Sequence, residues 1–256
     1  MSRLDRLPFA LKAAIKERTL LKVISGLDNF DSSSVERIAI AAGQGRADLL
    51  DVACKPELVR LASEASGLPV CVSAVDPELF PLAVEAGAKI IEIGNYDSFY
   101  PKGRKFDALE VLDITRATRE LLPEVVMSVT VPHTLTLDQQ SELAIKLVNE
   151  NADIIQTEGG VFARPVSPGN LGLIEKAAPT LAATYSITEA LKFEQLSTPV
   201  ICASGLSKVT APLAIASGAC GVGVGSVVNR LNDQLSMIAA VKGIREAIKK
   251  NIETKV

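Results

Sequence analysis

The sequence lacks tryptophan, contains a single histidine, and only 4% of its 256 residues are aromatic. Its net charge of −3 gives no excess of basic side chains to neutralise a phosphodiester backbone. Few aromatic rings are present to stack on bases. We therefore expect no nucleic-acid partner.

Cysteine is also scarce. The four cysteines, Cys54, Cys71, Cys202 and Cys220, are widely spaced and form no CxxC pair. With one histidine in the chain, no spacing predicts a zinc site or another metal site. We expect the cysteines to be small buried thiols in a reducing compartment.

Long apolar runs are missing as well. None reaches the roughly 18 residues that a membrane span needs. The N-terminal stretch MSRLDRLPFALKAAIKERT carries charges throughout and has no apolar core of a secretory signal. We expect a soluble, cytoplasmic protein with no membrane partner.

What the sequence does contain is a regular alternation of strand and helix patterns. Short runs rich in β-branched residues alternate with Ala- and Leu-rich helical stretches. The strand candidates are 20–26, 47–53, 69–75, 88–94, 125–131, 152–158, 199–205 and 221–227. The run TLAATYSI at 180–187 is a further strand candidate, but the spacing of its apolar residues favours a helix.

Eight strands, each followed by a helix or a long loop, predict a (β/α)8 barrel over about 250 residues. An open, doubly wound sheet is the alternative. No linker or shift in composition marks a second domain. We predict one TIM-barrel domain over residues 1–256 with an additional N-terminal helix.

Polar residues in the strands are expected to face the barrel interior, because the helices require an apolar outer face. Alternation turns Lys22, Asp51 and Glu92 inward, and Cys202 with Ser204 in the seventh strand. Buried charges are costly unless they are paired. Two interpretations stay open: a structural ion network, or a catalytic cluster in which lysine acts as acid, electrostatic anchor or imine-forming nucleophile.

Two further candidates lie at the carboxyl ends of strands, where barrel enzymes place their active sites. Glu158 ends the sixth strand, and His133 follows the fifth in VTVPHTL. A histidine there is suited to acid–base catalysis, although it is also an ordinary loop residue. The loop 95–106 holds aromatic and basic residues, which predicts either a lid over an anion or a packed rim.

The densest glycine stretch, GACGVGVGS at 218–226, does not fit a nucleotide-binding motif. Its G-x-G-x-G spacing fails the dinucleotide fingerprint, and no Gly-Lys-Ser/Thr follows. In a barrel, the loops after the seventh and eighth strands form phosphate sites. We predict that ASGLS at 203–207, through Ser204 and Gly205, and Gly225 with Ser226 bind phosphate, sulfate or a phosphorylated molecule. Glycine used for tight packing is the alternative.

Long runs spread over nearly the whole chain match one family pattern. They are LKVISGLDNFD, VCVSAVDPELF, IEIGNYDSFYPKG, SVTVPHTL, ADIIQTEGG, GLIEKAAPTLAATYSI, CASGLSKVTAPLAIASGACGVGVGS and VNRLND. In these runs the chain resembles the conserved hypothetical chloroplast open reading frame 23 family of algal plastids and cyanobacteria. The resemblance implies a phosphate-binding TIM barrel in a cyanobacterial cytoplasm or plastid stroma. It implies no activity, so the catalytic candidates depend on the strand argument alone.

These patterns leave three functions to separate. The first is an enzyme acting on a small phosphorylated metabolite, of lyase, isomerase or synthase type. The second is a barrel whose cofactor is FMN, with the flavin phosphate at Gly205 and Gly225. The third is a non-catalytic assembly or regulatory factor of the photosynthetic apparatus. A homodimer is the expected assembly, because it is the commonest one among soluble oligomers.

Overall fold

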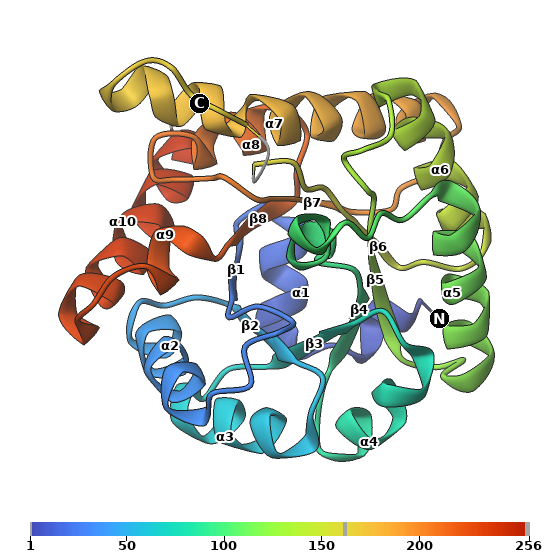
Figure 1. The fold of residues 1–256 in the computed structure, drawn as a ribbon, viewed down its shortest axis with the longest axis horizontal. Coiled ribbons are helices and arrows are strands. Elements are labelled where there is room, and N and C mark those ends of the chain that lie inside the picture. The colour runs from blue at the N-terminus through green and yellow to red at the C-terminus, as the bar shows by residue number, and fades with distance from the viewer. Residues whose placement is uncertain (1, 161–162, 254–256) are drawn as a thin grey trace.

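Eight parallel strands close into a barrel in the computed structural model, which describes residues 2–160 and 163–253, with side chains to residue 249. Neighbours around the barrel are neighbours in sequence, and β8 pairs with β1 to close the ring. The strands are β1 (Leu20–Ile24), β2 (Leu49–Ala53), β3 (Val70–Ala74), β4 (Ile90–Ile93), β5 (Val126–Thr130), β6 (Ile154–Gln156), β7 (Val200–Ala203) and β8 (Gly221–Val224). The predicted (β/α)8 barrel is confirmed (Figure 1).

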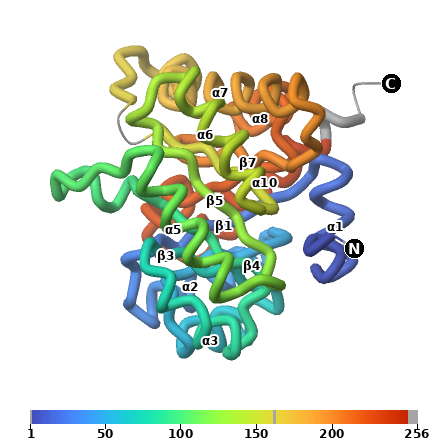
Figure 2. Tube along the Cα trace, turned by 90° about the vertical axis from the view of Figure 1, so that its right-hand side faces the viewer, coloured from blue at the N-terminus to red at the C-terminus, as the bar shows by residue number. Residues whose placement is uncertain are grey.

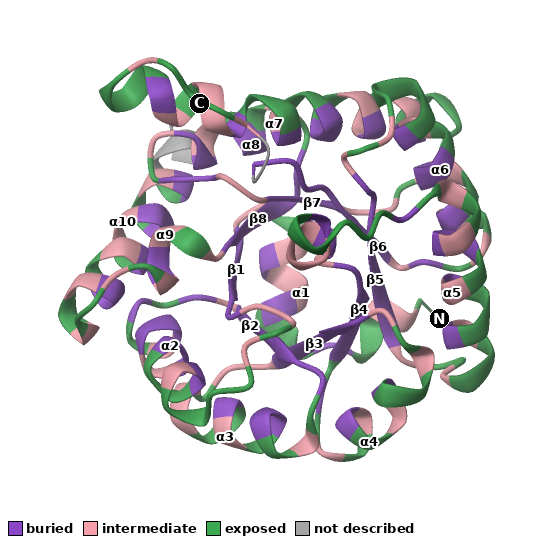
Figure 3. Cartoon of the chain, in the orientation of Figure 1, coloured by how far each residue is buried: buried purple, intermediate pink, exposed green. Residues whose placement is uncertain are grey.

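Helices follow the strands and form the outer ring. They are α2 (Ser32–Gln44), α3 (Pro56–Ser66), α4 (Phe80–Glu85), α5 (Ala108–Leu121), α6 (Leu137–Asn149), α7 (Gly169–Phe193), α8 (Ala211–Ala216), α9 (Ser226–Asn229) and α10 (Gln234–Glu253). Their inner faces are buried and their outer faces are exposed (Figure 3). The run 180–187 lies inside α7, as its spacing predicts. No described helix is both long and apolar enough to cross a membrane.

The two ends of the barrel are built differently. Helix α1 (Phe9–Lys16) lies at one end, and the turns that follow β4 project at the other, around residue 100 (Figure 2). Leu7 and Leu11 pack onto an apolar layer made by the first inward residue of several strands. That layer includes Leu20, Leu49, Ile90, Val126, Ile154 and Ile201. The N-terminal helix therefore closes one end, and the opposite mouth, where the strands' carboxyl ends lie, is left for a site.

One local prediction is wrong by a shift of one residue. Ile201, rather than Cys202, belongs to the interior layer, and Cys202 packs toward Thr180 of α7. Helix α2 is capped by Asp31, whose side chain accepts a hydrogen bond from Ser33 N.

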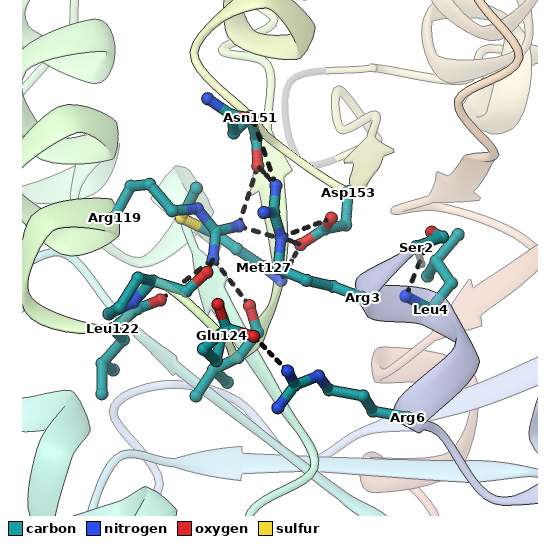
Figure 4. A network of polar contacts seen from close by, with 12 residues as sticks. Ser2, Arg3, Leu4, Arg6, Arg119, Leu122, Glu124, Met127, Asn151 and Asp153 are labelled. Atoms are coloured by element: carbon teal, nitrogen blue, oxygen red, sulfur yellow. Dashed lines mark hydrogen bonds and ion pairs between the residues drawn. The ribbon is translucent and has the colours of Figure 1, made fainter.

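A buried carboxylate anchors the N-terminal segment at the closed end (Figure 4). Asp153 accepts from Arg3 Nε at 2.9 Å, from Arg119 Nη2 at 2.8 Å and from Met127 N at 2.9 Å. Its side chain is 8% exposed. Burial lowers the pKa of Arg119, although the charge of Asp153 opposes this effect. The network joins the segment before α1 to β5 and to the loop before β6.

Replacing Asp153 with alanine is expected to lower the free energy of unfolding by about 2–4 kcal/mol, because it leaves a buried N–H and a half-buried guanidinium without their acceptor. Urea denaturation measures the loss. The matched control is Glu124→Gln, which removes the exposed pair with Arg6 and should cost less than about 1 kcal/mol. Equal losses in the two variants would contradict a structural role for Asp153.

Candidate active site at the barrel mouth

The three interior charges predicted from strand alternation come together in the barrel. Lys22 Nζ lies 3.0 Å from Asp51 Oδ2 and 2.5 Å from Glu92 Oε2. It also donates to Gln156 Oε1 at 3.1 Å. All three charged side chains are at most 1% exposed. The lysine of β1 is thus held between one carboxylate from β2 and one from β4.

The charge state of this cluster limits its chemistry. Burial alone would lower the pKa of Lys22, but the nearby Asp51 and Glu92 outweigh it and raise the pKa above its ordinary value. Burial raises the pKa of Glu92, and Lys22 counteracts part of that rise. Lys22 is therefore an ammonium ion with no free electron pair for imine formation. Of the two interpretations, this geometry supports a structural ion network, and a catalytic role for Lys22, Asp51 and Glu92 stays a prediction.

Polar residues connect this cluster to the open end of the barrel. Asn95 Nδ2 donates to Ser73 Oγ at 3.0 Å and to Glu92 Oε1 at 3.2 Å. Gln156 Nε2 donates to Glu92 Oε1 at 2.6 Å. Asn95 and Gln156 both line a cavity of about 190 Å³ at the strands' carboxyl ends. The ion network therefore lies beneath the floor of that cavity and fixes the residues that form it.

The four residues predicted to bind an anion lie together along one side of the cavity. Ser204, Gly205, Gly225 and Ser226 all line it. Ser204 and Gly205 follow β7 with φ of 74° and 73°. A left-handed serine is uncommon, and such residues concentrate at functional sites. The loops after β7 and β8 thus meet at one cavity, as the sequence predicts.

A close backbone contact sets the shape of this side. A Cβ on Gly160 would lie 2.5 Å from both the Cα and the N of Gly205. Gly160 N donates to Ser204 Oγ at 2.9 Å. Glycine is therefore required at 160 for the first part of the loop after β6 to touch the turn after β7. Gly160 belongs to the run EGG at 158–160, which does not by itself predict this contact.

Two cations that the sequence analysis did not select also line the cavity. Lys176 comes from α7 and Arg230 from the end of α9. Helices α8 and α9, which follow β7 and β8, are both short. We therefore assign the positive charge at this side to Lys176 and Arg230.

The adjoining side of the cavity is acidic. Asp97 and Glu158 line it, and Glu158 Oε1 accepts from His133 N at 3.2 Å and lies 3.1 Å from His133 Nδ1. Tyr100 donates its hydroxyl to the same oxygen. The structure therefore brings together the two predicted strand-end residues, and adds a tyrosine and an aspartate.

Asp97 has the more unusual environment of the two acids. Burial, and then the charge of Glu158, raise its pKa to about 7, although a hydrogen bond from Ser204 counteracts them. That bond, from Ser204 Oγ to Asp97 Oδ2, measures 2.9 Å. Ser204 therefore links the acidic side of the cavity to the glycine side.

The loop after β4 supplies Asp97 and covers the barrel mouth. It forms two 3-10 turns, Tyr96–Ser98 and Tyr100–Lys102, which lie in front of the barrel centre in Figure 1. Tyr96, Tyr100 and Phe106 are buried. The basic residues of the loop are exposed, and Arg104 pairs with Glu110. The aromatic residues thus pack on the rim, and the loop contributes an acid to the cavity.

The glycines of GVGVGS divide into two groups. A Cβ on Gly221 would meet Leu20 Cβ at 2.3 Å, and one on Gly223 would meet Ala203 Cβ at 2.8 Å. These two glycines serve strand packing inside the barrel. Gly225 and Ser226 lie beyond the strand and line the cavity. The packing interpretation therefore holds for Gly221 and Gly223, and phosphate binding by Gly225 and Ser226 stays a prediction.

Comparison with known proteins identifies a family and relatives that match most of the chain. A profile of the family described as "Protein of unknown function (DUF561)" matches residues 7–254. "Uncharacterized protein ycf23" of Cyanophora paradoxa is 43% identical over 235 residues, covering 91% of this chain and 94% of that protein. The protein of the same name from Porphyra purpurea is 36% identical over 235 residues, covering 92% and 87%.

Solved structures share the barrel at low sequence identity. Thiamine phosphate pyrophosphorylase from Pyrococcus furiosus aligns with a TM-score of 0.59 and 15% identity, covering 93% of this chain and 98% of that one. A 3-hexulose-6-phosphate synthase aligns with a TM-score of 0.62 and 15% identity, covering 89% and 99%. At this identity the likeness shows the fold alone.

Proposed function

This chain belongs to the DUF561 family and is related to the ycf23 proteins, and we propose that it binds a small phosphorylated metabolite in the cavity at the barrel mouth. The phosphate would lie against Ser204, Gly205, Gly225 and Ser226. The remainder of the molecule would extend toward Asp97 and Glu158.

The observation that carries this proposal is the polarity of the cavity. Lys176 and Arg230 line it together with the glycine turns, whereas Asp97 and Glu158 line it together with Asn95 and Gln156. A phosphate dianion would be attracted to the first set and repelled by the second. A ligand with one charged end and one reactive end fits this arrangement.

The size of the cavity favours a small ligand. Its volume of about 190 Å³ lies below the roughly 300–1,000 Å³ that is typical of sites for drug-sized molecules. FMN carries a three-ring isoalloxazine and needs a larger space than a phosphorylated three- to six-carbon compound. We therefore prefer the metabolite to the predicted alternative of FMN.

The names of the structural neighbours agree with this ligand class. The names thiamine phosphate pyrophosphorylase and 3-hexulose-6-phosphate synthase each refer to a phosphate ester. Barrels of this fold place phosphate sites after β7 and β8, where this chain has its glycine turns.

The acidic side supports catalysis of the lyase, isomerase or synthase type. Glu158 and His133 lie within hydrogen-bond distance of each other, and Glu158 faces the cavity. A carboxylate and an imidazole can move a proton to or from a substrate carbon or oxygen, or can hold a metal ion that assists this step. A cyanobacterial cytoplasm or plastid stroma is the compartment we propose.

Calorimetric titration of the protein with glycerol 1-phosphate tests the proposal. We expect saturable binding of the ester and none of glycerol. Arg230→Gln and Lys176→Gln should each weaken binding about 10- to 100-fold, because each removes a charged hydrogen bond worth about 1.5–3 kcal/mol. Lys192→Gln is the matched control, since Lys192 lies on the same helix as Lys176 and its side chain is 78% exposed.

Three results would contradict the proposal. A yellow protein that releases flavin on denaturation would favour FMN. Equal binding of ester and alcohol would show that the phosphate is not recognised. A cavity that binds no ester, in a protein that retains a stable macromolecular partner, would favour the non-catalytic assembly factor.

A further inference from the structure

Three metal-ligating side chains from different strand ends meet at the acidic side of the cavity. A carboxylate oxygen of Asp97, one of Glu158 and a ring nitrogen of His133 all lie within 4.8 Å of one another. We propose that these three residues hold a divalent cation of the Mn²⁺ or Zn²⁺ class. The three positions are far apart in the sequence, so no local spacing predicts this site.

Unpartnered carboxylate oxygens give this cluster a second, independent mark of a cation site. Glu158 is only 4% exposed, and its Oε2 is buried without a hydrogen-bond partner among the described residues. The same holds for Oδ1 of Asp97. Buried carboxylate oxygens are normally hydrogen-bonded, paired with a cation or bound to a metal. Glu158 Oε1, by contrast, is used by Tyr100 and His133.

In the interior cluster, by contrast, a lysine offsets the charge of the two carboxylates. Ligand atoms of Asp51, Cys71 and Glu92 also lie within 4.8 Å of one another, but Lys22 Nζ contacts both carboxylates there. Within residues 2–160 and 163–249, no lysine or arginine nitrogen lies within 4.0 Å of a carboxylate oxygen of Asp97 or Glu158. The mouth cluster therefore carries two acids close together without such a contact, although Lys176, which lines the same cavity, lowers the pKa of Asp97 from a longer distance.

The donor set selects the class of ion. Carboxylates suit Mg²⁺, Ca²⁺ and Mn²⁺, whereas imidazole suits Zn²⁺ and other late transition metals. Two carboxylates with one imidazole therefore favour Mn²⁺ or Zn²⁺. Ligand bonds of about 2.0–2.2 Å place opposite donors at most about 4.4 Å apart. The three donor atoms, which lie within 4.8 Å of one another, would move closer together on binding.

The surroundings of the cluster are those of a catalytic rather than a structural metal site. Three protein ligands leave coordination positions open. Asp97 and Glu158 line the cavity, so the open positions would face a bound molecule. Ser204 and Tyr100 donate to Asp97 Oδ2 and Glu158 Oε1, which orients the ligands. A cation there would polarise a carbonyl or hydroxyl oxygen at the end of the ligand away from its phosphate.

This inference goes beyond the proposed function and is tested without any phosphate ester. The chain is treated with EDTA, dialysed, and titrated with MnCl2 while the free Mn²⁺ signal is followed by electron paramagnetic resonance. We expect one saturable site per chain, and competition by ZnCl2. Glu158→Gln and Asp97→Asn should each weaken Mn²⁺ binding at least 10- to 100-fold, as loss of one metal ligand does, with the fold checked by circular dichroism. Glu64→Gln, an exposed acid on α3, is the control and should bind as the wild type does.

Absence of a saturable site in the wild-type chain up to 1 mM of either metal would overturn the inference, whatever the variants do. Wild-type affinity in both Glu158→Gln and Asp97→Asn would overturn it as well, because the metal would then be held elsewhere. Binding of glycerol 1-phosphate by the EDTA-treated protein is measured separately. Failure of the metal site and failure of the phosphate site are thus distinguishable.

Discussion

Replacing Lys22 with methionine is expected to lower the free energy of unfolding by about 3–5 kcal/mol, because it leaves the carboxylates of Asp51 and Glu92 buried and uncompensated. Chemical denaturation followed by circular dichroism measures the loss. In the variant, Glu92 loses the charge that lowers its pKa, so its pKa rises further above that of the unfolded chain. The folded variant then takes up a proton more readily than the unfolded chain, and the deficit should shrink from pH 8 to pH 5.

Two companion variants make this result specific to the interior charges. Adding Asp51→Asn and Glu92→Gln to Lys22→Met should recover more than half of the lost stability, since no unpaired charge then remains. Lys192→Met replaces an exposed lysine and should change stability by less than about 1 kcal/mol. A Lys22→Met variant that unfolds like the wild type would contradict the structural ion network and favour the catalytic interpretation of Lys22.

Replacing Gly160 with alanine is expected to weaken binding of glycerol 1-phosphate at least tenfold and to lower the free energy of unfolding by about 1–3 kcal/mol. The added methyl group would lie 2.5 Å from the N and Cα of Gly205. Both atoms belong to backbone, which cannot move aside as a flexible side chain can. The turn at Ser204 and Gly205 must therefore shift, and the anion side of the cavity shifts with it. Calorimetric titration and urea denaturation measure the two effects.

Gly243→Ala is the matched control for this glycine. It lies in α10, where an added Cβ would meet only Lys208 Cδ at 3.9 Å. Alanine there should leave ester binding unchanged and raise stability by up to about 1 kcal/mol, because alanine favours helix. Unchanged ester binding in Gly160→Ala would show that the turn after β7 is not part of the binding site.

The fold could be predicted from the sequence because its pattern repeats. Each β-branched run in Ala- and Leu-rich surroundings became a strand of the barrel, and the ambiguous run at 180–187 became helix. Period-two alternation also placed Lys22, Asp51 and Glu92 in the interior. It failed in β7, where Cys202 faces α7, because a short run of small apolar residues gives no polar marker of register.

The candidate site could be predicted only in part. Glu158, Ser204, Gly205 and Gly225 follow strands, and the strand-end rule placed them at the cavity. The same rule also applies to Asp97, which closely follows β4. The aromatic and basic residues of its loop instead predict a lid or a packed rim, and neither assigns a role to Asp97. Lys176 does not follow a strand, so the strand-end rule does not select it. Its position on α7 meets the cavity only through the packing of that helix, which no local pattern encodes.

The most direct test of the barrel mouth as a phosphate-ester site is a crystal structure of the protein soaked with glycerol 1-phosphate. We predict density for the phosphate beside Ser204, Gly205, Gly225 and Ser226, with its oxygens about 3 Å from backbone nitrogens and the carbon chain directed toward Glu158. Density for the phosphate elsewhere on the barrel, with this cavity filled only by water, would contradict the account.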